Sequence, residues 1–173
     1  MATSKTPTDA IALLKADHRK VEGLFAQYEK AKASTRKKDL ATQICFELTV
    51  HAKIEEDIFY PACSEDGVDE DLMDEAYVEH DSAKVLIAEI EKGNPDDDYY
   101  DAKVKVLSEM IKHHVKEEEK KQGNMFAKAK QAGVDTKALG QQMAAEKKTL
   151  TAQYKSQGLP KPATPTFTGT RLA

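Results

Sequence analysis

Four stretches of this chain each place a histidine on the side of a helix that faces a protein core. The apolar residues around each histidine recur at steps of three and four residues, which is the period of an amphipathic helix. The histidines are His18, His51, His80 and either His113 or His114. Imidazole fills a core poorly unless something pairs with it. The pattern therefore predicts a helix bundle that binds something in its interior.

Composition agrees with one helical domain and disfavours several classes of protein. Of 173 residues, 32% are charged and 6% are aromatic, with a net charge of −4. Lysines are mixed with acids rather than gathered into a basic stripe, which disfavours nucleic acid as a partner. No apolar run approaches the roughly 20 residues that span a membrane, and the first eight residues lack an apolar secretory core. Cys45 and Cys63 match no metal or redox spacing, so we expect free thiols and a cytoplasmic protein.

Helix start and stop signals divide the chain into five expected helices. Thr6 is the expected N-cap of the first, which runs over about 8–33, and the second ends near Pro61. Further helices are expected over about 69–92, from about 97 with an interruption at 120–124, and over about 136–156. The prediction is an all-α, up-down-up-down four-helix bundle over 8–130 after a flexible segment 1–7. An accessory helix over 135–157 and a disordered tail over 158–173 follow.

Two of the expected helices carry a histidine followed by a glutamate one turn later. His51 precedes Glu55, and His114 precedes Glu118. Residues i and i+4 lie on the same helix face, so imidazole and carboxylate reach a common point. The alternative pair is His113 with Glu117. We favour the first pair because its row continues upstream through apolar residues, whereas the other row reaches a lysine.

These side chains suit a pair of metal ions. Two six-coordinate ions need about 12 ligand positions, of which four imidazoles, two bridging carboxylates and one bridging hydroxide or water fill all but about two. The predicted metal ligands are His18, His51, Glu55, His80, His114 and Glu118. Glu56 and Asp81 lie beside ligands and are expected to be solvated surface acids rather than groups that orient imidazoles. The open positions predict binding of a small molecule.

The chain resembles the hemerythrin-like (HHE cation-binding) family, bacterial type, over about residues 8–129. The resemblance rests on the motifs KADHRKVEGLF, ELTVHAKIEEDIFYPA, EAYVEHDSAKVLI and MIKHHVKEEE. It implies a non-haem di-iron site in which the four histidines are terminal ligands and the two glutamates bridge. The family's oxygen carriers have a further histidine where this chain has Lys84, and an aspartate where it has Glu118. These departures disfavour reversible oxygen carriage.

The leading hypothesis is a cytoplasmic protein with two iron ions and a bridging oxo or hydroxo group. It would bind or sense O2, peroxide or NO, or buffer iron. A second hypothesis is a di-iron enzyme that decomposes peroxide or performs an oxidation, and a third is a metal-free helical interaction module. The sequence does not decide whether the protein turns over a substrate. Nitrogen and oxygen ligands also suit manganese and zinc.

Overall fold

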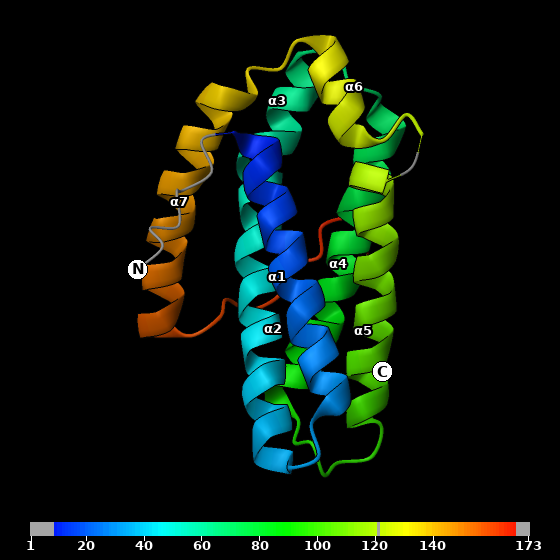
Figure 1. The fold of residues 1–173 in the computed structure, drawn as a ribbon, viewed down its shortest axis with the longest axis vertical. Helices are drawn as coiled ribbons and strands as arrows, with labels where there is room; N and C mark the ends of the chain where they lie inside the picture. Colours follow the sequence, from blue (N-terminus) through cyan, green and yellow to red (C-terminus); the bar gives the residue numbers. More distant parts are fainter. Residues whose placement is uncertain (1–8, 121, 169–173) are drawn as a thin grey trace.

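The computed structural model describes residues 9–120 and 122–168, and its centre is a bundle of four antiparallel helices. These are α1 (Ala10–Lys30), α2 (Ser34–Ile54), α4 (Glu70–Lys92) and α5 (Tyr100–Val115). They run alternately up and down along the long axis (Figure 1). The connections at 31–33 and 93–99 are short, which forces neighbouring helices to run antiparallel. The predicted all-α bundle is confirmed.

Two of the bundle helices continue through a π-helical turn. The first is η1 (Glu55–Phe59), which leads from α2 into α3 (Tyr60–Glu65). The second is η2 (Lys116–Lys120), which extends α5 before the chain turns into α6 (Met125–Ala132). The predicted end of the second helix near Pro61 is therefore wrong. Pro61 lies in the first turn of α3, where a missing backbone N–H is tolerated.

The start of α1 also differs from the prediction. Asp9 is the N-cap, and its Oδ1 accepts a hydrogen bond from the Ala12 backbone N–H at 3.0 Å. Thr6, the predicted N-cap, lies outside the described residues, as does the segment 1–7 that was expected to be flexible. An aspartate side chain at this position accepts from an otherwise unpaired N–H, and its negative charge interacts favourably with the positive end of the helix dipole.

The apolar core has two parts. One cluster fills the end of the bundle near α3 and α6, with Leu14, Ile54 and Phe59 among its members. The other fills the opposite end, with Phe25, Leu40 and Leu107 among its members. Between them lies a layer of buried polar side chains, which the histidine depths in the sequence predicted.

The accessory helix α7 (Thr136–Gln157) packs beside α1 and α2 (Figure 1). A glycine allows this close approach: a Cβ built on Gly140 would lie 2.7 Å from the backbone nitrogen of Ala10. The Thr136 hydroxyl donates to Asp9 Oδ2 at 2.5 Å, so the cap of α1 also anchors the start of α7.

The segment after α7 differs from the predicted disordered tail. Residues 158–168 have no helix, yet they cross behind α2 and reach α4 (Figure 1). There the backbone N–H and the hydroxyl of Thr166 donate to Asp81 Oδ2 at 2.8 and 2.7 Å. Composition did not show this contact because it depends on a buried acid far away in sequence. Residues 169–173 lie outside the described part of the chain. Within 9–120 and 122–168, no helix is long and apolar enough to cross a membrane.

Candidate metal centre

The polar layer contains all six residues that the sequence predicts as metal ligands, and each is at most 5% exposed. His18 comes from α1, His51 from the last turn of α2 and His80 from α4. His114 comes from the last turn of α5, while Glu55 and Glu118 come from the two π-helical turns. The bundle thus brings together six side chains from four helical rods at one depth.

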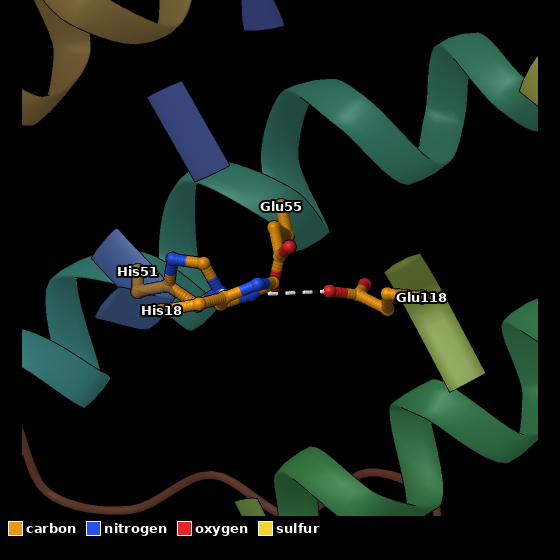
Figure 2. Close-up of side chains that lie close together, drawn as sticks. All are labelled: His18, His51, Glu55 and Glu118. Atoms are coloured by element: carbon orange, nitrogen blue, oxygen red, sulfur yellow. Dashed lines mark hydrogen bonds and ion pairs between the residues drawn. The ribbon is translucent and has the colours of Figure 1, made fainter. Parts of the chain in front are cut away.

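Four of these side chains form one compact group: His18, His51, Glu55 and Glu118. Figure 2 shows their nitrogen and oxygen atoms turned toward a common point. The Nε2 atoms of His18 and His51 are 3.1 Å apart. Glu55 Oε2 lies 3.1 Å from His51 Nε2, and Glu118 Oε2 lies 3.3 Å from His18 Nε2.

A second group shares Glu55 with the first. It consists of Glu55, His80 and His114, and the Nε2 atoms of the two histidines are 3.2 Å apart. Glu55 Oε2 lies 3.4 Å from His80 Nε2. Glu118 also spans both groups, because its Oε1 lies 3.5 Å from His114 Nε2. Each of the two carboxylates therefore lies between the two histidine pairs and faces a histidine of each.

The π-helical turns explain how both glutamates reach the centre. A π turn adds a residue to the helical repeat and shifts the side chains that follow. Glu55 begins η1 and Glu118 lies within η2, so the backbone changes its repeat at the two positions where carboxylates enter the interior. Such turns are frequently found at functional sites. The helix interruption that the sequence predicted at 120–124 lies at the end of η2, whereas nothing in the sequence predicted η1.

Two of the histidines donate to a carboxylate on the side away from the centre. His80 Nδ1 lies 2.9 Å from Glu56 Oε1, and His114 Nδ1 lies 2.7 Å from Glu79 Oε2. A carboxylate that accepts the Nδ1 proton leaves the Nε2 lone pair facing the centre, which is how metal-binding imidazoles are usually held.

The other two histidines face carboxylates at longer distances. His51 Nδ1 lies 3.4 Å from Asp17, whose carboxylate also binds Lys147. His18 Nδ1 lies 3.6 Å from Glu119, too far for a hydrogen bond. Arg19 binds Glu119 from the solvent side. All four histidines therefore have an outer acid, but only those on α4 and α5 are tightly held.

The expectation that Glu56 and Asp81 are solvated surface acids is wrong for both. The Glu56 side chain is 17% exposed and bonds to His80, and the Asp81 side chain is 2% exposed. Lys84 bridges them, with its Nζ 3.0 Å from Glu56 Oε2 and 2.9 Å from Asp81 Oδ1. Lys84, which stands where the family's oxygen carriers have a further histidine, thus binds the Glu56 carboxylate that accepts from His80.

The structure places His113 and His114 on different sides of α5. The His113 side chain is 56% exposed and lies 3.4 Å from Glu79 Oε1. His114 is 3% exposed and faces the centre. The pair His114 and Glu118, favoured from the sequence, is the one that the fold brings to the buried layer, whereas Glu117 is half-buried.

Sequence reasoning missed a tyrosine at the centre. The Tyr60 hydroxyl donates to Glu118 Oε1 at 2.9 Å and lies 3.4 Å from both Glu55 Oε2 and His80 Nε2. Tyr60 follows Glu55 by five residues, a spacing that puts two side chains on different faces of an α-helix but in register across a π turn. Only the π turn would have revealed it.

The donor set fits a bound cation. When Nδ1 donates to a carboxylate, Nε2 carries a lone pair, so the close Nε2 pairs would repel each other without a cation or proton between them. Among the residues that the structure describes, Glu55 Oε1 and Glu118 Oε2 are buried without a hydrogen-bond partner, although buried polar atoms almost always have one. Imidazole nitrogen and carboxylate oxygen are both ligands of iron, manganese and zinc.

The electrostatics of the protein side chains favour the protonated forms of His51 and His80. Burial alone would lower the pKa of His51, but Glu55 and Asp17 outweigh it and raise this pKa to about 10. The pKa of His80 likewise rises to about 9 against burial, because Glu55 and Glu56 accept from the ring. Burial raises the pKa of Tyr60 well above its ordinary value, and Glu118 adds to the effect, so the hydroxyl remains a donor.

The fold and this layer define a four-helix bundle protein with a buried histidine and carboxylate centre. The family model for the Hemerythrin HHE cation binding domain matches residues 9–126, and the chain belongs to this family. The family and the two side-chain groups together support a bound metal cofactor.

Two known proteins show how far the similarity extends. A crystal structure of a Hemerythrin HHE cation binding domain-containing protein from Mycobacterium kansasii superposes with a TM-score of 0.71 at 22% identity. The match covers 87% of this chain and 94% of that one, and it shows a shared fold. A protein named DNA nickase from Nostoc sp. is 28% identical over 107 residues, which are 62% of this chain and 30% of the relative.

Proposed function

We propose that this protein binds two iron ions in the buried layer. It would use them to bind or sense a small ligand (O2, peroxide or NO) or to buffer iron. The observation that carries the proposal is the shared position of Glu55, whose carboxylate belongs to both histidine groups. His18 and His51 would hold one ion, His80 and His114 the other, and Glu55 and Glu118 would bridge. Iron bound there supplies redox chemistry and open coordination positions.

The residues around the centre support this use. His80 and His114 are fixed in orientation by Glu56 and Glu79. The Tyr60 hydroxyl can hold a proton at Glu118 Oε1. Apolar clusters lie above and below the layer and lower the local dielectric, which strengthens electrostatic interactions there. Two buried free cysteines, Cys45 and Cys63, agree with our proposal of a cytoplasmic protein.

Elemental analysis of the purified protein tests the proposal. We expect about two irons per chain after anaerobic reconstitution with Fe²⁺, and an absorption band in air that is lost on reduction. Glu55→Gln should reduce the iron content to below one per chain, because it weakens a ligand of both ions. Glu47→Gln on the same helix, where Glu47 pairs with Lys20 at the surface, should leave the iron content unchanged. Wild-type protein that takes up no iron would refute the proposal.

A second candidate function is an enzyme that decomposes peroxide at the same centre, and Tyr60 favours it. Cleavage of the O–O bond needs a proton donor, and this hydroxyl lies among the proposed ligands. Turnover of hydrogen peroxide that falls in Tyr60→Phe at unchanged iron content would support the enzyme. Stoichiometric ligand binding without turnover would support the binding protein. We do not propose DNA nicking, because the chain matches only 30% of that relative and carries a net charge of −4.

A further inference from the structure

A cavity of about 820 Å³ lies directly beside the proposed metal centre. His51, His80 and His114 line it. Along α4 the lining positions are 80, 83, 84, 87, 88, 91 and 92, which form one continuous helix face. At a rise of about 1.5 Å per residue, the eleven steps from His80 to Glu91 correspond to a length of about 16 Å. The cavity is therefore long, and the histidines lie toward one end.

The walls of this cavity are mainly apolar. Leu48 from α2 and Ala83 and Ile87 from α4 form part of them. The segment that follows α7 contributes Leu159 and Pro162, and it crosses the bundle to α4 (Figure 1). Pockets of 300–1,000 Å³ with such walls accommodate organic molecules. O2, peroxide and NO each need only a small fraction of this volume.

Two residues of the cavity lining have a buried polar atom without a hydrogen-bond partner among the described residues: His18, which belongs to the proposed metal centre, and Glu91, which does not. Glu91 lies three helical turns from His80, and its Oε1 is buried and accepts no hydrogen bond from the described part of the chain. The nearby Lys38 does not satisfy it, because the Lys38 ammonium donates to the backbone carbonyls of Ile90, Glu91 and Gly93. Burial raises the pKa of Glu91, as expected for a carboxyl that lacks solvation.

Most other charged residues of the lining are already paired, and Lys92 and Lys161 are exposed to solvent. Asp17 binds Lys147, Lys53 binds Asp57, and Lys84 binds two acids. These pairs need no further ligand. A molecule that fills the cavity would therefore find an acceptor in need of a donor at Glu91, and apolar surface from there to the histidines.

We propose that the cavity binds an elongated, mainly aliphatic molecule whose hydrogen-bond-donating end, an amine or a hydroxyl, contacts Glu91. Its apolar body lies along α4 beneath residues 159–163, with the opposite end toward His80. Binding itself does not need the metal. That the bound molecule reaches a redox centre rests on the proposed function, and makes it a candidate substrate or effector of the iron site.

Calorimetric titration of the full chain, metal-free and iron-loaded, tests the proposal with dodecylamine, dodecanol and hexylamine, each below its solubility limit and dodecylamine also below its critical micelle concentration. We expect one molecule of dodecylamine or dodecanol to bind per chain in both forms of the protein. The compound with the higher affinity shows whether an amine or a hydroxyl is the preferred polar end of the bound molecule. Each buried methylene contributes about fourfold in affinity, so hexylamine should bind at least about a hundredfold more weakly. Failure of the iron proposal would appear in elemental analysis and not in the metal-free titration.

Variants on α4 locate the bound molecule. Ala88→Phe fills the cavity and should abolish binding, whereas Val85→Phe, at a residue 47% exposed, should not change it. Glu91→Gln should weaken dodecylamine about tenfold, because a charge-assisted hydrogen bond is lost, and change dodecanol little. No binding of either twelve-carbon compound, or equal binding by folded Ala88→Phe, would overturn the proposal. Tighter binding of dodecanoate than of dodecylamine would overturn the role of Glu91.

Discussion

The hydroxyl of Tyr60 donates to Glu118 Oε1 at 2.9 Å, which ties α3 to the π-helical turn of another bundle helix. Both side chains are completely buried. A neutral phenol and a carboxylate in this contact stabilise each other, and the contact places a proton at the proposed metal centre. The relationship leads to the first prediction.

Tyr60→Phe should lower the free energy of unfolding of the metal-free protein by about 1–3 kcal/mol, because Glu118 Oε1 loses a buried donor. Chemical denaturation measures this value. Tyr100→Phe is the matched control: Tyr100 is also buried, but its hydroxyl has no hydrogen-bond partner within 9–120 and 122–168. It should change stability by less than about 0.5 kcal/mol. Equal effects of the two substitutions would contradict a specific role for Tyr60.

Glu79→Gln should weaken metal binding about 10- to 100-fold, because Glu79 accepts from His114 Nδ1 and fixes the orientation of its ring. Glu75→Gln offers a control one turn earlier on α4, since Glu75 is exposed and lies 4.0 Å from the surface residue His113. Metal affinity would be measured by competition with a chelator. The same loss in both variants would point to surface charge rather than to ring orientation.

Metal uptake should release protons and become tighter as pH rises. The pKa values of His51 and His80 are raised from 6.5 to about 10 and about 9 in the metal-free protein. Because these pKa values are raised, protonation stabilises the metal-free fold fully below pH 6.5, and this stabilisation is lost as pH rises through about 9 to 10. Metal needs neutral imidazoles, so binding near pH 7.5 should release about two protons per chain.

An indicator dye in weakly buffered solution measures this release. His113→Gln is a suitable control because the side chain is mostly exposed and lies outside the buried layer. It should leave the proton count unchanged. Metal binding with no release of protons, and with an affinity independent of pH, would show that the histidines are already neutral.

Thr166→Val should loosen the segment that crosses the bundle. The substitution removes the hydroxyl donor to Asp81 Oδ2 and retains the backbone bond, so we expect a loss of about 0.5–1.5 kcal/mol. Faster cleavage within residues 158–168 by a protease of broad specificity would report this loosening, since the proline after Lys161 blocks trypsin there. Thr168→Val, at an exposed position, should cleave at the wild-type rate. Equally fast cleavage of both variants would show that the hydroxyl does not hold the segment.

The sequence predicted the bundle and the composition of the buried layer because both follow from local periodicity. A histidine at a three- or four-residue step from Leu14 or Val21 can only face the core, and short turns fix the depth at which His18 and His51 meet. His51 with Glu55 required only the i, i+4 spacing. For these features, neighbouring residues along the chain carry the information.

The tertiary structure alone decided the surroundings of that layer. Tyr60 enters through a change of helical repeat that its neighbours do not signal, and Glu56 and Glu79 become partners of His80 and His114 only when helices pack. The contact of Thr166 with Asp81 joins residues 85 positions apart. Such contacts depend on where helices lie relative to one another, and no periodicity within a single segment encodes that.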